Sequence, residues 1–257
     1  MRVDAHHHFW RYTPLAFDWI DERMQSLRRD FLLIDLEPEL AAASVDTTVV
    51  FHARQTLEEI RWLLECAARS PSIRAVVGWA PLAPKDFSDT LGPLRSDGLL
   101  KDLRHVVQGE PADFLDDVGF NRGIDCLLET GLVYNLLIVA RQLEESARFV
   151  DRHPNQSFVL DHIAKPDIAN GSFSAWETPF RELARRENVV CKLSGMVTEA
   201  EWKQWSGTAL KPYFDTALEA FGSERLMCAS DWPVLTVAST YKQWWRTLNG
   251  WTAPLSE

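Results

Sequence analysis

The sequence predicts a single-domain α/β protein, spanning residues 1–257, whose eight parallel strands close into a (β/α)8 barrel. Short apolar or β-branched runs alternate with helical patterns along the whole chain. Several of these runs are continuously apolar, as expected for parallel strands that are covered on both faces. Eight such units in a chain of about 250 residues are typical of this barrel. A doubly wound open sheet is the alternative, but no GxGxxG follows any predicted strand.

The order of elements along the chain follows from the apolar pattern. Strands are expected at 2–8, 47–52, 73–79, 101–107, 132–138, 156–162, 189–193 and 225–231. Helical spacing predicts helices over 56–69, 112–130, 140–152, 175–187, 208–221 and 239–248. The first helix opens on Thr56-Leu57-Glu58-Glu59, which is typical of a capping box. Residues 9–40 form a long insertion after strand 1, which would wall the catalytic face of a barrel.

The end of the sequence is short for this architecture. Only 26 residues follow Asp231, and they hold one helical pattern with a tryptophan-rich face. The closing Leu255-Ser256-Glu257 resembles the start of another helix. We therefore expect that a final helix is missing from this sequence.

Charge and cysteine usage narrow the class of partner. The net charge of −10 argues against a nucleic-acid or anionic-membrane surface. No apolar run approaches the ~18 residues that a membrane helix needs, and the first residues do not form a signal peptide. Four scattered cysteines without a CxxC pair indicate reduced thiols. We expect a cytoplasmic monomer or homodimer that handles a small molecule.

The strongest local signal is the histidine run near the start of the chain. Side chains alternate along a strand, so Asp4, His6 and His8 share one face and His7 lies on the other. Two imidazoles two positions apart at the carboxyl end of a strand can chelate one divalent ion. A partial affinity tag or a surface histidine run is the alternative reading, but the run is short and lies inside a strand.

Two more strand ends carry groups that could join such a centre. His162 ends an apolar run and Lys165 follows it; alone, His162 would be read as a core or loop histidine, but beside the first motif it becomes a third imidazole. Asp231 ends the last strand and could bind a metal, deprotonate a water or cap a helix. Arg104, His105 and Lys192 lie in or at the end of strands 4 and 7, where a buried cation must be paired or used.

Taken in order, these pieces are similar to a known family. The segments are Asp4 to Trp10, Val77-Gly78-Trp79, Arg104-His105, Asp161-His162-Ile163-Ala164-Lys165-Pro166, Cys191-Lys192-Leu193-Ser194-Gly195 and Ser230-Asp231-Trp232-Pro233-Val234. They resemble the amidohydrolase superfamily of the amidohydrolase-2 type, and within it the L-fuconolactonase-like and L-rhamnonolactonase-like sugar lactonases. One departure is His52, which stands where the family leads us to expect glutamine.

The resemblance implies a TIM-type barrel of the metal-dependent hydrolase kind. It implies metal ligands at His6, His8, His162 and Asp231, with one divalent ion, zinc first. No carboxylated lysine or glutamate can be assigned as the bridge for a second ion, and catalysis without metal stays an alternative.

The function that we expect is hydrolytic opening of a 1,4- or 1,5-lactone of a sugar acid. Asp231 would be the general base, with His162 and Arg104 in catalytic roles. The substrate would be bound by Trp10, Trp79, His105, Lys165, Lys192 and Trp232. Two alternatives remain: a metal-dependent non-oxidative decarboxylase of an aromatic or unsaturated acid, and a barrel that binds a sugar acid without turnover.

Overall fold

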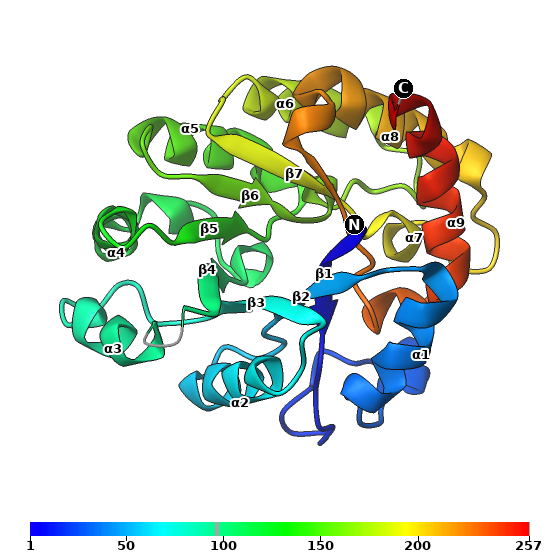
Figure 1. The fold of residues 1–257 in the computed structure, drawn as a ribbon. Coiled ribbons are helices and arrows are strands. Elements are labelled where there is room, and N and C mark those ends of the chain that lie inside the picture. Colours follow the sequence, from blue (N-terminus) through cyan, green and yellow to red (C-terminus); the bar gives the residue numbers. More distant parts are fainter. Residues whose placement is uncertain (96–97, 257) are drawn as a thin grey trace.

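Eight parallel strands form one sheet in sequence order in the computed structural model, which describes residues 1–95 and 98–256 (Figure 1). The strands are β1 (Val3–His8), β2 (Thr47–Phe51), β3 (Ile73–Gly78), β4 (Leu100–His105), β5 (Val133–Leu136), β6 (Phe158–Leu160), β7 (Val189–Leu193) and β8 (Leu226–Cys228). The helices lie outside this sheet, as Figure 1 shows. The predicted (β/α)8 barrel and its eight strands are confirmed, although β4, β5, β6 and β8 each end two or three residues earlier than expected.

The barrel closes where the chain after β8 meets β1. Asp231 donates its backbone N–H to the carbonyl oxygen of His6 at 2.8 Å, and His8 donates to that of Trp232 at 2.6 Å. Nearer the start of β1, the fully buried carboxylate of Asp4 accepts two hydrogen bonds from Ser230, one from the backbone N–H at 2.8 Å and one from the hydroxyl at 2.6 Å. It also accepts a hydrogen bond from the hydroxyl of Tyr241 at 2.9 Å. Burial raises the pKa of Asp4 to about 6, against these hydrogen bonds. The seam therefore fixes Asp231 in register with the histidines of β1.

The helices agree with the prediction in part. The six predicted helices are present as α2 (Leu57–Ala68), α4 (Val118–Leu128), α5 (Leu143–Arg152), α6 (Phe173–Ala184), α8 (Gly207–Phe221) and α9 (Tyr241–Thr252). Three more were not predicted: α1 (Leu33–Ala43), α3 (Phe87–Leu94) and α7 (Met196–Glu199). Pro38 in α1 and Pro93 in α3 weaken the helical signal, and four residues are too few to show a helical period.

The capping box expected at the start of α2 forms only in half. The hydroxyl of Thr56 accepts from the backbone N–H of Glu59 at 3.3 Å. The carboxylate of Glu59 turns to the loop that follows β2, where it accepts from the N–H groups of Ala53 and Arg54 at 2.6 and 3.1 Å. Glu59 thus secures that loop instead of the amide of Thr56.

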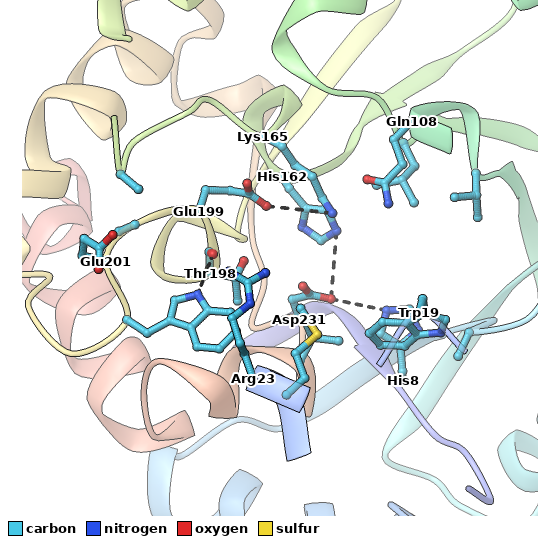
Figure 2. Close-up of a pocket in the computed structure, with 18 of the residues that line it drawn as sticks. His8, Trp19, Arg23, Gln108, His162, Lys165, Thr198, Glu199, Glu201 and Asp231 are labelled. Atoms are coloured by element: carbon cyan, nitrogen blue, oxygen red, sulfur yellow. Dashed lines mark hydrogen bonds and ion pairs between the residues drawn. The ribbon is translucent and has the colours of Figure 1, made fainter. Parts of the chain in front are cut away.

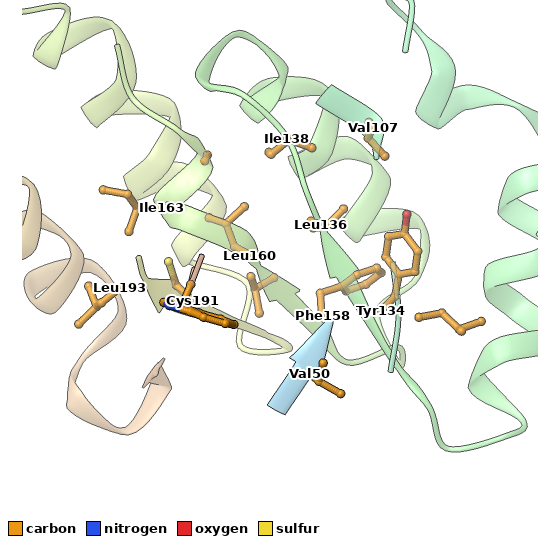
Figure 3. Close-up of a cluster of buried hydrophobic side chains, with 14 of the residues drawn as sticks. Val50, Val107, Tyr134, Leu136, Ile138, Phe158, Leu160, Ile163, Cys191 and Leu193 are labelled. Carbon is orange, nitrogen blue, oxygen red and sulfur yellow. The ribbon is translucent and has the colours of Figure 1, made fainter. Parts of the chain in front are cut away.

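Apolar side chains from several strands fill the space between the sheet and the helices. Figure 3 shows one such cluster, in which Leu136, Leu160 and Cys191 from three successive strands are fully buried. All four cysteines are free thiols. Within residues 1–95 and 98–256, no helix is both long and apolar enough to cross a membrane.

Candidate active site

A cavity of about 990 Å³ opens at the carboxyl ends of the strands, the end at which barrel enzymes place their active sites (Figure 2). Of the residues predicted for the site, its wall includes His8, Trp10, Arg104, His162, Lys165 and Asp231. His6 lies directly behind His8 and is fully buried.

Three acceptor atoms converge at the floor of this cavity. The Nε2 atoms of His6 and His8 are 3.1 Å apart, and Oδ1 of Asp231 lies 3.6 Å from the first and 3.3 Å from the second. Ligands at about 2.0–2.2 Å from a tetrahedral zinc ion stand roughly 3.3–3.6 Å apart. The alternation of side chains on β1 had predicted that His6 and His8 share a face, and the structure places both beside Asp231.

The hydrogen bonds around these imidazoles favour a cation between them. His8 Nδ1 must donate to the carbonyl oxygen of Phe51 at 3.1 Å, so in the neutral ring Nε2 carries a lone pair. Nδ1 of His6 lies 3.7 Å from Oδ1 of Asp161, a carboxylate that can only accept, so in the neutral ring the proton is favoured on Nδ1 and the lone pair on Nε2. Burial lowers the pKa of His6 well below its usual value, so the ring of His6 is neutral. The lone pairs of both rings and a carboxylate oxygen therefore face one another, which is a donor set that fits one divalent ion.

His162 reaches the cavity by an unusual backbone turn. The four residues from His162 to Lys165 follow β6 with φ between 45° and 60°, in the left-handed region. In a continued strand, adjacent residues 161 and 162 would point to opposite faces; in this turn both Asp161 and His162 lie near His6. Trp176 steadies the turn by donating its indole N–H to the carbonyl oxygen of Ile163 at 2.7 Å.

The position of His162 separates it from the three-atom set. Its Nε2 is 4.0 Å from Oδ1 of Asp231, and it belongs to a second group of potential ligands with His6 and Asp161. Its Nδ1 is 2.8 Å from the hydroxyl of Ser194. Burial lowers the pKa of His162 to about 4, although the neighbouring carboxylates oppose this shift, so the ring is neutral at pH 7.

Asp161, which we did not assign a role from sequence, is the centre of a buried ionic cluster. Lys192 donates to its Oδ1 at 2.8 Å, and Arg104 contacts Oδ2 at 3.2 Å. Burial opposes ionisation of Asp161, but Lys192, His6 and Arg104 hold its pKa well below the usual range. Lys192 also donates to Asn135 at 2.7 Å. The negative charge of Asp161, the carboxylate in the second group of potential ligands, is therefore already balanced by two cationic side chains.

Several residues expected to bind substrate lie outside the cavity wall. Trp79 donates its indole N–H to His105 at 3.1 Å, and His105 in turn contacts Glu110 at 2.7 Å. Trp232 is 3% exposed and packs edge-on against Phe9 and Phe31. Lys192 is engaged by Asp161 as described. Among the residues that line the cavity are others that sequence reasoning missed: Trp19, Arg23, Gln108, Thr198, Glu199 and Trp202.

Comparison with known proteins identifies the family of the chain. Residues 3–256 match the amidohydrolase family, and the chain belongs to it. It is 38% identical over 255 residues to an L-fucono-1,5-lactonase of Burkholderia multivorans, covering 95% of this chain and 86% of that protein. An L-fucono-1,5-lactonase of Burkholderia ambifaria is 36% identical over 241 residues, with coverages of 93% and 83%. A crystal structure of an amidohydrolase from Burkholderia multivorans with bound zinc has a TM-score of 0.96 at 36% identity and covers 99% of this chain and 92% of that chain.

Proposed function

We propose that this protein is a lactonase that hydrolyses the ring ester of a sugar-acid lactone. The observation that carries the proposal is the convergence of His6, His8 and Asp231 at the floor of the cavity, in a chain that aligns over 95% of its length with an L-fucono-1,5-lactonase. The decarboxylase alternative has less support, because both of these curated relatives are lactonases.

Asp231 is proposed as the general base that accepts a proton from the attacking water. Burial alone would raise its pKa, but His162, His8 and Lys165 outweigh burial and hold the pKa below its usual value. The carboxylate is therefore ionised at neutral pH. Its Oδ1 faces the imidazoles and lies at the edge of the cavity, where a water and the lactone carbonyl carbon can meet.

A divalent ion held by His6, His8 and Asp231 would polarise the lactone carbonyl and lower the pKa of water from ~15.7 towards ~7. A carboxylate of depressed pKa is a weak base, so the water that it deprotonates must be made more acidic in this way. The zinc bound by the related amidohydrolase makes zinc the first candidate. We expect one ion per chain, because Lys192 and Arg104 already neutralise Asp161 in the second group.

Arg104 and His162 complete the reaction by contacts with oxygen atoms. As water attacks, negative charge develops on the carbonyl oxygen, and the guanidinium of Arg104, which lines the cavity, would stabilise it. The ring C–O bond then breaks, and the proton held by Asp231 passes to the leaving alkoxide. The neutral ring of His162, 4.0 Å from Asp231, is close enough to share a hydrogen-bonded water or substrate oxygen with it.

The direct test is release of acid from a panel of 1,4- and 1,5-aldonolactones, followed with a pH indicator in the presence and absence of a chelator. We expect turnover of at least one lactone, loss of most of it on chelation, and recovery with Zn²⁺. Hydroxybenzoates serve as the contrasting substrates. Carbon dioxide release from these, without acid release from any lactone by folded, zinc-loaded protein, would overturn the proposal.

A glycine controls the placement of His162. Gly195 has φ of 74°, and a Cβ there would lie 2.7 Å from Cβ of His162. Gly131 has φ of 71° and no atom within 4 Å of the same position, so it provides a matched control for the backbone strain. We expect Gly131→Ala to lose about 1–2 kcal/mol of stability, measured by urea unfolding, and Gly195→Ala to lose more because of its contact with His162. Only Gly195→Ala should also lose lactonase kcat/KM, by about ten-fold or more, since a misplacement of about 1 Å can cost 10²-fold. Equal activity in the two variants would contradict this role.

A further inference from the structure

The cavity contains a carboxylate whose hydrogen-bonding capacity the protein itself leaves unused. Glu199 is the last residue of α7 and lines the cavity with a side chain that is 29% exposed. Within residues 1–95 and 98–256, the structure gives its carboxylate no hydrogen-bond donor. Its nearest charged partner is Nζ of Lys165, at 4.0 Å, which is beyond hydrogen-bonding distance.

The backbone beneath Glu199 is held firmly in place. The Glu199 amide donates to the carbonyl oxygen of Gly195 at 3.2 Å, and its own carbonyl oxygen accepts from Ala169 at 3.0 Å. Ala169 belongs to the same loop as Lys165. The two charged side chains thus come from two segments that are tied to each other, and Figure 2 shows both directed toward the region of His162 and Asp231.

The environment of Glu199 favours a ligand that can donate a hydrogen bond. Burial raises the pKa of this carboxyl; Lys165 opposes the rise and Asp231 adds to it. A carboxylate that is partly removed from water and lacks donors is unfavourable until something donates to it. Lys165, which is 22% exposed, offers only donors.

A hydroxyl group satisfies both side chains at once, because it is a donor and an acceptor. An oxygen about 2.8 Å from the Glu199 carboxylate and the same distance from the Lys165 ammonium closes a triangle over their 4.0 Å separation, with an angle of roughly 90° at that oxygen. Neither a methylene group nor a carboxylate of the substrate meets both requirements.

We propose that Glu199 and Lys165 together bind one ring hydroxyl of the substrate and so restrict the enzyme to lactones that carry a hydroxyl at that position. This inference rests on the proposed lactonase function. It makes Glu199 a specificity-determining residue, distinct from a general acid, which would serve every lactone equally.

The test compares substrates as well as variants. Wild type, Glu199→Gln and Lys165→Met are assayed with a fully hydroxylated aldonolactone and with the matched lactones that each lack a single hydroxyl. We expect Glu199→Gln to lower kcat/KM for the full lactone by about ten- to hundred-fold, the usual effect of losing a hydrogen bond to a charged group. For one deoxy lactone, kcat/KM of the wild type should be lower by a similar factor. Glu199→Gln and Lys165→Met should lower kcat/KM for that lactone little further.

Glu187→Gln is the matched control, since it makes the same change of charge at an exposed position just before β7, outside the cavity wall. It should change kcat/KM for every lactone by less than about two-fold, as is usual for a surface substitution. If Glu199→Gln slows all lactones by the same factor, or slows none, the proposal is wrong while the lactonase function stands. If wild type hydrolyses no lactone at all, the proposed function itself fails.

Discussion

Asp231→Asn should lower kcat/KM for the best lactone by about 10²–10⁴-fold, the usual contribution of a general base. Asparagine has the same shape but accepts no proton, and it weakens the three-atom set in which Oδ1 of Asp231 lies 3.3 Å from His8. The measurement is acid release under kcat/KM conditions. Circular dichroism and the melting temperature show whether the fold is retained.

Two further measurements separate the roles of Asp231. Asp215→Asn is the matched control, because Asp215 forms an i,i+4 pair with Lys211 on α8, and it should retain nearly full activity. The zinc content of Asp231→Asn then distinguishes base from ligand: an inactive variant that still binds zinc has lost the base, whereas loss of zinc shows that the carboxylate is needed for binding. More than a tenth of wild-type activity in Asp231→Asn would refute its assignment as base.

Lys192→Met should destabilise the protein by about 3–5 kcal/mol, because it removes the closer of the two cations that pair with a buried carboxylate. Asp161 is fully buried, and Lys192 is its closest cation at 2.8 Å. The free energy of unfolding in urea measures the effect. The double variant Lys192→Met/Asp161→Asn should recover part of the loss, because it removes the buried carboxylate together with Lys192, while Arg104 loses its carboxylate partner. Failure of both variants to differ from wild type would show that the pair carries little energy.

The loss of unfolding free energy caused by Lys192→Met should also depend on pH. In wild type the folded-state pKa of Asp161 is depressed, so its contribution to stability is present above the unfolded value of ~3.9 and is lost as the pH falls through the folded value. Without Lys192 the folded-state pKa rises towards the unfolded value, so this contribution to stability becomes smaller. The difference between the two proteins should therefore shrink as the pH is lowered from ~5 towards ~3, in urea titrations at each pH.

The sequence was most informative where side-chain direction follows from a regular element. Alternation along β1 placed His6 and His8 on one face, and the apolar run before Asp231 placed that carboxylate at the same end of the barrel. Both expectations needed only the strand period and the parallel arrangement of strands. The helices with clear apolar spacing were found for the same reason.

The rest of the site depends on backbone conformations that the residue types do not predict. No glycine occurs between His162 and Lys165, so nothing in the sequence signals four consecutive residues with positive φ. Asp161 was therefore left without a role although it stands beside His162. Glu199 lies on a helix of four residues. Trp79, His105 and Trp232 were assigned to the site because they lie in the family's motifs. Their contacts with one another and with the core are tertiary contacts, which a motif does not reveal.

The seam between β1 and the segment after β8 has a consequence for how the protein is made. The hydrogen bond from Ser230 to Asp4 joins positions 226 apart in the chain. At 5–20 residues per second, the ribosome needs roughly 10–45 s to extend the chain from one to the other. During that time the first strand has one open edge, and open strand edges invite pairing with other chains. Nascent chains should therefore be most vulnerable to aggregation before the last strand emerges, and neither catalysis nor metal capture by the three-atom set can begin until it does.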